Sequence, residues 1–123
     1  MLDPILSLPR QRDYVGPNGS EVRLLAASSA GGLSHVTLDS LRCSLGVRHC
    51  TVEELWFVVS GEGELWRAFG KLERIDTIRA GDSLRLAAGV RYQFRAFVAL
   101  KLIVATMPTW PGPDEAVETE GPW

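Results

Sequence analysis

Short apolar runs recur along this 123-residue chain, and turn-forming residues separate them about every 8–12 residues, as in all-β sandwiches and barrels. Helical periodicity is hard to find in any of these runs. Because no helical crossover separates them, the strands that they predict must pair antiparallel. A double-sheet jelly roll or a small barrel then leaves few strand edges unpaired. We therefore expect an all-β fold of about eight or nine antiparallel strands. The expected strands cover residues 21–27, 33–38, 46–50, 54–59, 64–69, 73–78, 83–86, 91–97 and 100–106.

The chain is expected to form one domain in three parts, because its length suits a single compact core. These parts are an N-terminal arm (1–20), the barrel (21–106) and a proline-rich C-terminal tail (107–123). Four prolines in the tail lack the backbone donor that a central strand needs. Large aromatic side chains are costly to leave in water, so we expect Trp110 and Trp123 to fix the tail to the barrel surface.

Two blocks of sequence carry the candidate chemistry. In the first, His49 and Glu54 precede an apolar run that ends at Gly61, where we expect a tight turn. The second block opens at Gly81, twenty residues later. This pair of blocks resembles the paired motifs of the cupin superfamily, whose small barrels often hold a metal on three histidines and a glutamate. The resemblance covers roughly residues 33–106 and implies a double-stranded β-helix, also called a jelly-roll barrel.

The ligand positions of those motifs are only partly filled in this chain. Counting back from the motif glycine places Glu54 at the glutamate position. His49 fills either the second histidine position, with Val47 in the first, or the first position, with Thr51 in the second. In the second motif Tyr92 stands where the resemblance implies a histidine.

A complete three-histidine site is impossible within one subunit, because the chain has only His35 and His49. A tight divalent site usually needs three or four protein ligands, and His49 and Glu54 supply two. Tyr92 would have to ionise to become a third ligand, against an ordinary pKa of about 10. The sequence therefore does not predict any particular cofactor. The alternative left open is a divalent ion (iron, manganese or zinc) on His49 and Glu54, with His35 as a further candidate ligand.

Strand alternation predicts what the barrel encloses. Glu54 and Trp56 share one face of their strand, and Tyr92 and Phe94 share one face of another. If these faces turn inward, the lumen is aromatic with a few polar groups, as in small-molecule pockets. The alternative is a filled core without a cavity. The candidate ligand-binding residues are His35, Thr51, Trp56, Tyr92 and Phe94, and the candidate catalytic residues are His49, Glu54 and Tyr92.

Two functions are compatible with these residues. The first is a binding protein that holds a small polar or aromatic molecule in the lumen without a complete metal site. The alternative is an enzyme of the sugar isomerase, epimerase or oxygenase type, which the cupin resemblance implies. Such an enzyme would use His49 and Glu54 as metal ligands or as an acid–base pair. The structural alternative for His49 is a buried polar cluster without a catalytic role, and the alternative for His35 is a strand histidine with a backbone partner.

Charge and composition limit the partners. A net charge of −2 gives no electrostatic reason to bind nucleic acid or an anionic membrane. No apolar run approaches the roughly 20 residues that a membrane-spanning helix needs. The first ten residues contain an acid and prolines where a signal peptide has a basic segment and an apolar core, so we expect a cytoplasmic protein with reduced cysteines. Apart from Glu54, strand 54–59 is apolar on both faces, which predicts a cover from the N-terminal segment or from a second subunit in a homodimer.

Overall fold

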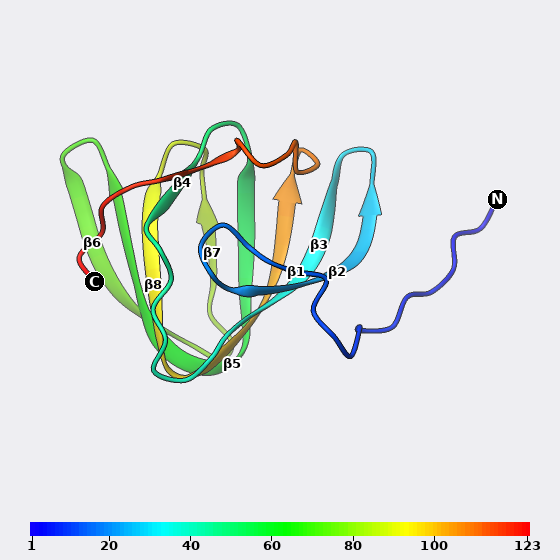
Figure 1. The fold of residues 1–123 in the computed structure, drawn as a ribbon, viewed down its shortest axis with the longest axis horizontal. Helices are drawn as coiled ribbons and strands as arrows, with labels where there is room; N and C mark the ends of the chain where they lie inside the picture. The colour runs from blue at the N-terminus through cyan, green and yellow to red at the C-terminus, as the bar shows by residue number, and fades with distance from the viewer.

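The computed structural model describes all 123 residues and contains nine β-strands and no helix (Figure 1). Every strand pairing is antiparallel, so the expected all-β class is confirmed. The strands are β1 (Tyr14–Val15), β2 (Glu21–Ser28), β3 (Gly31–Leu38), β4 (Val47–His49), β5 (Glu53–Phe69), β6 (Leu72–Arg79), β7 (Ser83–Leu86), β8 (Arg91–Met107) and β9 (Ala116–Glu118). No helix that is long and apolar enough to cross a membrane is present.

Two long strands, β5 and β8, form the centre of the fold. They pair antiparallel along nearly their whole length, from Glu53 opposite Met107 to Ala68 opposite Arg91. The second half of β8 also pairs with β3, which continues to β2 and β1, while β6 and β7 pair with β5. The start of β8 pairs with β4, and β4 pairs with β9 from the C-terminal tail. The sheet therefore curls around an enclosed interior (Figure 1).

The tight turn expected at Gly61 is wrong, because β5 continues through it. Between residues 58 and 63 the register of β5 against β8 shifts, and Gly61 has a φ of 96°. A Cβ atom added at Gly61 would overlap the carbonyl of Ala99, and one added at Gly63 would overlap the carbonyl of Arg95. These glycines therefore allow two strands to pass closely at a bulged bend, rather than ending a strand.

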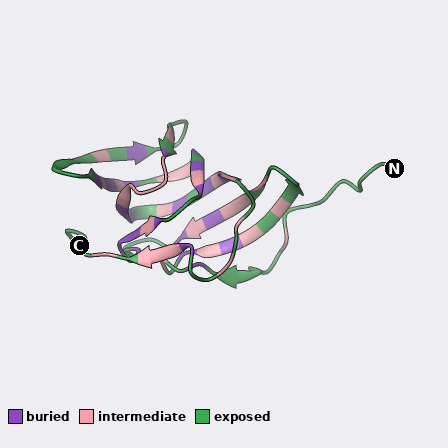
Figure 2. Cartoon of the chain, turned by 90° about the horizontal axis from the view of Figure 1, so that it is seen from above, coloured by how far each residue is buried: buried purple, intermediate pink, exposed green.

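The core follows from strand alternation. Figure 2 shows buried and exposed positions following one another along the strands. The inward side chains of both halves of the barrel form a single apolar cluster. Its members are Val22, Val36, Leu38, Val47, Trp56, Val58, Leu65, Ile78, Leu86, Tyr92, Phe94, Ala96, Leu100, Leu102 and Val104.

The two ends of the chain behave differently. At the C-terminus, the backbone N–H of Trp123 donates to the side-chain oxygen of Gln93 at 3.1 Å, and Gln93 Nε2 donates to the Trp123 carbonyl at 3.0 Å. The guanidinium of Arg95 lies over the Trp123 ring, 4.2 Å from its centroid. The N-terminal residues 1–8 instead project away from the barrel (Figures 1 and 2).

Candidate functional site

A cavity of about 320 Å³ opens in the barrel interior. Its wall combines the inner faces of β2 and β3 with inward side chains from β4, β5 and β8. The rest of the wall comes from two end segments, with the residues Tyr14, Gly16, Pro17, Asn18 and Ser20 before β2 and Thr109, Trp110 and Ala116 in the tail. The lining is predominantly apolar, and the polar groups described next lie on it.

Glu54 brings a buried carboxyl group into this wall. The residue is 8% exposed, and its position on β5 places it beside Thr106 of β8. Trp56 Nε1 donates to Glu54 Oε1 at 3.1 Å, and the Thr106 hydroxyl donates to Oε2 at 3.4 Å. Burial raises the pKa of Glu54 above its ordinary value, although the nearby charge of His49 and these two hydrogen bonds oppose the rise. Glu54 therefore retains its proton at a pH where an exposed glutamate has lost it.

His49 and Tyr92 form a pair on the same wall. The Tyr92 hydroxyl lies 3.3 Å from His49 Nε2, and the two rings meet edge to face with centroids 5.6 Å apart. The ring of Trp110 packs edge-on against the imidazole at 5.2 Å. Burial, with the negative charge of Glu54, raises the pKa of Tyr92 well above its usual range. Tyr92 is therefore a neutral phenol that shares a hydrogen bond with the imidazole and does not supply a phenolate for a metal.

Three aromatic rings line the cavity beside these polar groups. Trp56 meets Tyr92 edge to face at 5.6 Å and Phe94 at 5.1 Å. All three rings line the cavity, as do His49 and Glu54. The structure thus brings together five of the residues singled out from the sequence.

The other two candidates lie elsewhere. His35 sits on β3 between Ser34 and Val36, which line the cavity, so alternation turns His35 to the outside of the barrel. Burial, together with two neighbouring cations, lowers the pKa of His35. Thr51 is exposed, and its hydroxyl lies 3.0 Å from both carboxylate oxygens of Glu115.

Glu115 is a neighbour of the candidate site that sequence reasoning missed. Its carboxylate accepts hydrogen bonds from the backbone N–H groups of Thr51, at 2.7 Å, and of Val52. These residues connect β4 to β5, so Glu115 holds the segment between His49 and Glu54. Burial alone would raise the pKa of Glu115, but these backbone hydrogen bonds bring it below its ordinary value. Nothing local in the sequence marks this contact, because the acid lies in the tail, 64 residues from Thr51.

Both end segments also reach the cavity. Tyr14 of β1 lines it, and burial together with the charge of Glu54 raises the pKa of this phenol. Asn18 and Trp110 line the same space. The loop around Asn18 is fixed to the body because its carbonyl accepts the N–H of Leu45 at 2.8 Å. The binding space therefore extends beyond residues 21–106, into segments that the sequence division places outside the barrel.

The charges and donors of the cavity determine what it can hold. No lysine or arginine lines it. His49 and Glu54 are its only candidate metal ligands of the usual type, and the chain contains no group of three or more His, Cys, Asp or Glu side chains that could hold a metal ion. A donor set of two, with His49 Nε2 facing a phenol, does not fit a tightly held divalent ion.

Comparison with known proteins identifies the fold. No protein-family model and no curated protein sequence matches the chain. Among solved structures, an uncharacterised Klebsiella pneumoniae protein with a double-stranded β-helix domain matches with a TM-score of 0.73 at 14% identity, over 98% of this chain and 100% of that one. The cupin fold expected from the two sequence blocks is confirmed: the chain is a small, single-barrel double-stranded β-helix.

Two further similar structures come from one Streptomyces protein. A variant of PAC13 with uridine matches with a TM-score of 0.76 at 12% identity, covering 97% of this chain and 92% of that one. Pac13 itself, described as a unique nucleoside dehydratase, matches with a TM-score of 0.73 at 10% identity, over 94% and 92% of the two chains. At such identities the similarity defines the fold and leaves the activity of this chain open.

Proposed function

We propose that this protein binds a small, uncharged molecule with a flat ring in the barrel cavity, without a complete metal site. The observation that carries the proposal is a cavity of about 320 Å³ that combines an aromatic wall with a buried carboxyl group and a histidine–tyrosine pair. This volume lies at the lower end of the range of about 300–1,000 Å³ for small-molecule sites. Flat rings pack well against Trp56 and Phe94, and the polar groups orient them.

The absence of lysine and arginine from the wall argues for an uncharged ligand. An anion would enter a largely apolar space without a cationic partner, at a substantial desolvation cost. It would also lie near Glu54, whose own ionisation burial already disfavours. Uridine is uncharged and carries a flat base and hydroxyl groups, and a similar structure, that of the PAC13 variant, is with uridine. A nucleoside is therefore the first probe to use.

Isothermal titration calorimetry with uridine and with uridine 5′-monophosphate tests this proposal. We expect uridine to bind at least about tenfold more tightly than the monophosphate, because the phosphate would be desolvated without a partner. Tyr92→Phe and Glu54→Gln should each weaken uridine binding. Glu53→Gln is the matched control, because Glu53 is adjacent on β5 but hydrogen-bonds Arg85 on the outside. Tighter binding of the monophosphate, or binding unaffected by both cavity variants, would contradict the proposal.

A second candidate is an enzyme that transfers protons on such a ligand. The observation that favours it is a carboxyl group of raised pKa in one wall with an imidazole, which are the parts of an acid–base pair. Glu54 would give a proton to a leaving hydroxyl or carbonyl oxygen, and His49 would accept one. Turnover by metal-free protein that is lost in Glu54→Gln even at a uridine concentration that saturates the variant would establish this activity over simple binding.

We also propose a homodimer in the cytoplasm. The outer side chains of β5, Leu55, Phe57 and Val59, are between 44% and 48% exposed, so a single chain leaves this apolar face in water. Both cysteines, Cys43 and Cys50, are free thiols, which suits a reducing compartment. Light scattering at micromolar concentration should give the mass of two chains, and the mass of one chain would contradict the dimer.

A further inference from the structure

The chain carries two apolar surfaces that the single molecule leaves wholly or partly in water. One is the outer face, defined here as Leu33, Leu55, Phe57, Val59, Ile103 and Ala105 on β3, β5 and β8. Ile103 and Ala105 are half-buried, the other four are exposed, and Leu33 also borders the cavity. The other is the arm, defined as residues 1–8, which contains Met1, Leu2, Ile5, Leu6 and Leu8. Each of these five arm residues is more than half exposed.

Strand register places the outer-face residues side by side. One row crosses four neighbouring strands. In order it contains Phe57 of β5, Ile103 of β8, His35 of β3 and Arg23 of β2. A second row joins Leu55, Ala105 and Leu33 in the same way. The alternate residues of β5, Trp56 and Val58, are buried in the core. The two rows therefore point outward together and form one mainly apolar surface, with His35 between Ile103 and Arg23 at its end.

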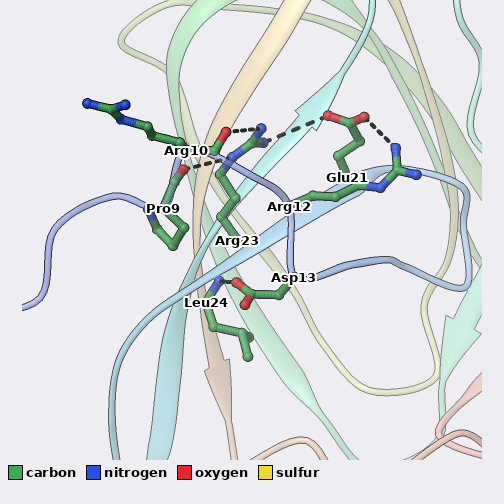
Figure 3. A network of polar contacts seen from close by, with 7 residues as sticks. All are labelled: Pro9, Arg10, Arg12, Asp13, Glu21, Arg23 and Leu24. Atoms are coloured by element: carbon green, nitrogen blue, oxygen red, sulfur yellow. Dashed lines mark hydrogen bonds and ion pairs between the residues drawn. The ribbon is translucent and has the colours of Figure 1, made fainter.

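The root of the arm is fixed at this same end of the outer face. Arg23 Nε donates to the carbonyl of Pro9 at 3.1 Å, and its guanidinium NH2 donates to the carbonyl of Arg10 at 3.4 Å (Figure 3). Arg12 pairs with Glu21 at 2.9 Å, and Asp13 accepts the backbone N–H of Leu24 at 2.7 Å (Figure 3). The arm thus leaves the barrel from a defined point on the β2 edge.

Beyond this root the arm points away from its own barrel (Figures 1 and 2). Leu2 and Ile5 are 97% and 99% exposed, so the arm makes almost no contact with the body of its own chain. Pro4 and Pro9 favour extended backbone at the residues before them, which keeps the arm from folding back as a helix. An extended apolar segment of this kind needs a surface on another molecule.

We propose that the arm of one copy lies across the outer face of a second copy, and that the second copy returns the same contact. Eight extended residues span up to about 26–29 Å. The distance from β2 across β3 and β8 to β5 is three strand spacings, or about 14 Å, so the arm is long enough to cross the face. A two-fold axis generates both contacts from one pair of complementary surfaces. This inference rests on the proposed homodimer and names the contact that holds it together.

Charge at the two surfaces agrees with this pairing. Asp3 is the only charged side chain in the arm, and Lys101 lies beside Ile103 in the outward row of β8. Neither residue makes an ion pair within its own chain. An arm crossing the outer face of a second copy can bring the Asp3 carboxylate close to the Lys101 ammonium.

Full-length variants and sedimentation equilibrium test the contact. The arm variant carries Leu2→Asp, Ile5→Asp and Leu6→Asp, and the face variant carries Phe57→Asp. We expect each to dissociate at least about a hundredfold more readily than the wild type, because large apolar contacts are lost. An equimolar mixture of the two variants should recover mixed dimers, since one supplies an intact arm and the other an intact outer face. Phe69→Asp, which changes a 60% exposed phenylalanine on the same strand outside the outer face, should remain a dimer.

Three results would overturn the inference, and thermal unfolding of each variant ensures that folded protein is compared. In the first, the arm variant dimerises as tightly as the wild type while the face variant is a monomer. This would mean that the outer faces pair directly without the arms. Two monomeric variants that form no mixed dimer would mean that the arm packs on its own barrel. Both results leave the proposed homodimer standing, whereas a monomeric wild type removes the dimer and the arm contact together.

Discussion

At the scale of single residues, Glu115 shows how a distant acid shapes the site. Its carboxylate receives the backbone N–H groups of Thr51 and Val52 in the connection between β4 and β5. We expect Glu115→Gln to destabilise the protein by about 1–3 kcal/mol, because an amide replaces a charged acceptor and leaves a buried N–H poorly paired. Urea unfolding at pH 7 measures the loss. Glu118→Gln, on the exposed side of β9, should change stability little.

The loss at Glu115 should also depend on pH, and its sign follows from the lowered pKa. A carboxyl group whose folded pKa lies below its unfolded value stabilises the fold above the unfolded pKa, near pH 4.3 for glutamate. That contribution disappears as the pH falls through the folded pKa. The difference between wild type and Glu115→Gln should therefore shrink on acidification. A difference that grows toward low pH would contradict the assignment.

Site residues were predictable where a local pattern determines their direction. Glu54 and Trp56 share a strand face by alternation, and Tyr92 and Phe94 do so on β8, so all four line the cavity as one wall. For His35 the sequence offered only a candidate role on a predicted strand, and the register of β3 turns the side chain outward. Which face of an isolated strand meets the core depends on its partners, and a single strand does not contain that information.

At the scale of strands, the bend in β5 gives a direct test of why Gly61 is a glycine. Gly61→Ala should destabilise the fold by about 2–4 kcal/mol, because its Cβ would overlap the Ala99 carbonyl and its φ is positive. Gly19 has a similar φ of 90° but open space around a Cβ position. Gly19→Ala should therefore cost only about 1 kcal/mol, the conformational part. Equal losses in thermal or urea unfolding would mean that the close approach to β8 is not what requires Gly61.

The same bend shows where strand prediction from sequence stops. Strands such as β7, at Ser83–Leu86, are found from their apolar runs because punctuating residues bound them on both sides. Gly61 looks the same in a sequence whether it ends a strand or bends one, since both uses need a positive φ. The deciding neighbour, Ala99, lies on another strand that sequence reasoning had itself divided in two. Long bent strands are therefore predicted as pairs of short ones.

At the scale of the whole molecule, the fold class followed from the sequence but the extent of the site did not. The walls of the barrel come from strands, whose alternation is visible in the sequence. The remaining wall of the cavity comes from Tyr14 at one end of the chain and Trp110 at the other. The tail that carries Trp110 is held to the barrel by the pairing of β4 with β9, which joins segments about 70 residues apart, whereas Tyr14 lies on β1, which pairs with the neighbouring β2. Such long-range contacts carry no periodic signal.

Stability as a function of pH tests the whole arrangement through Glu54. Its folded pKa is raised, so the folded chain holds more protons than the unfolded chain above about pH 4.3. This group therefore makes the protein less stable as the pH rises from there toward the folded pKa, by up to about 1.4 kcal/mol for each unit between the two values. Glu115 and Asp76 have lowered pKa values and act in the opposite sense. Those contributions are the same in Glu54→Gln and in the wild type, so they cancel when the two free energies of unfolding are subtracted. In urea unfolding, the stability of the variant relative to the wild type should therefore increase between pH 4 and pH 7.

The outward-facing control, Glu53→Gln, should follow the wild-type curve. If the stability of Glu54→Gln relative to the wild type instead falls as the pH rises, the cavity contains an ionised, stabilising carboxylate, and the site has no proton donor at Glu54.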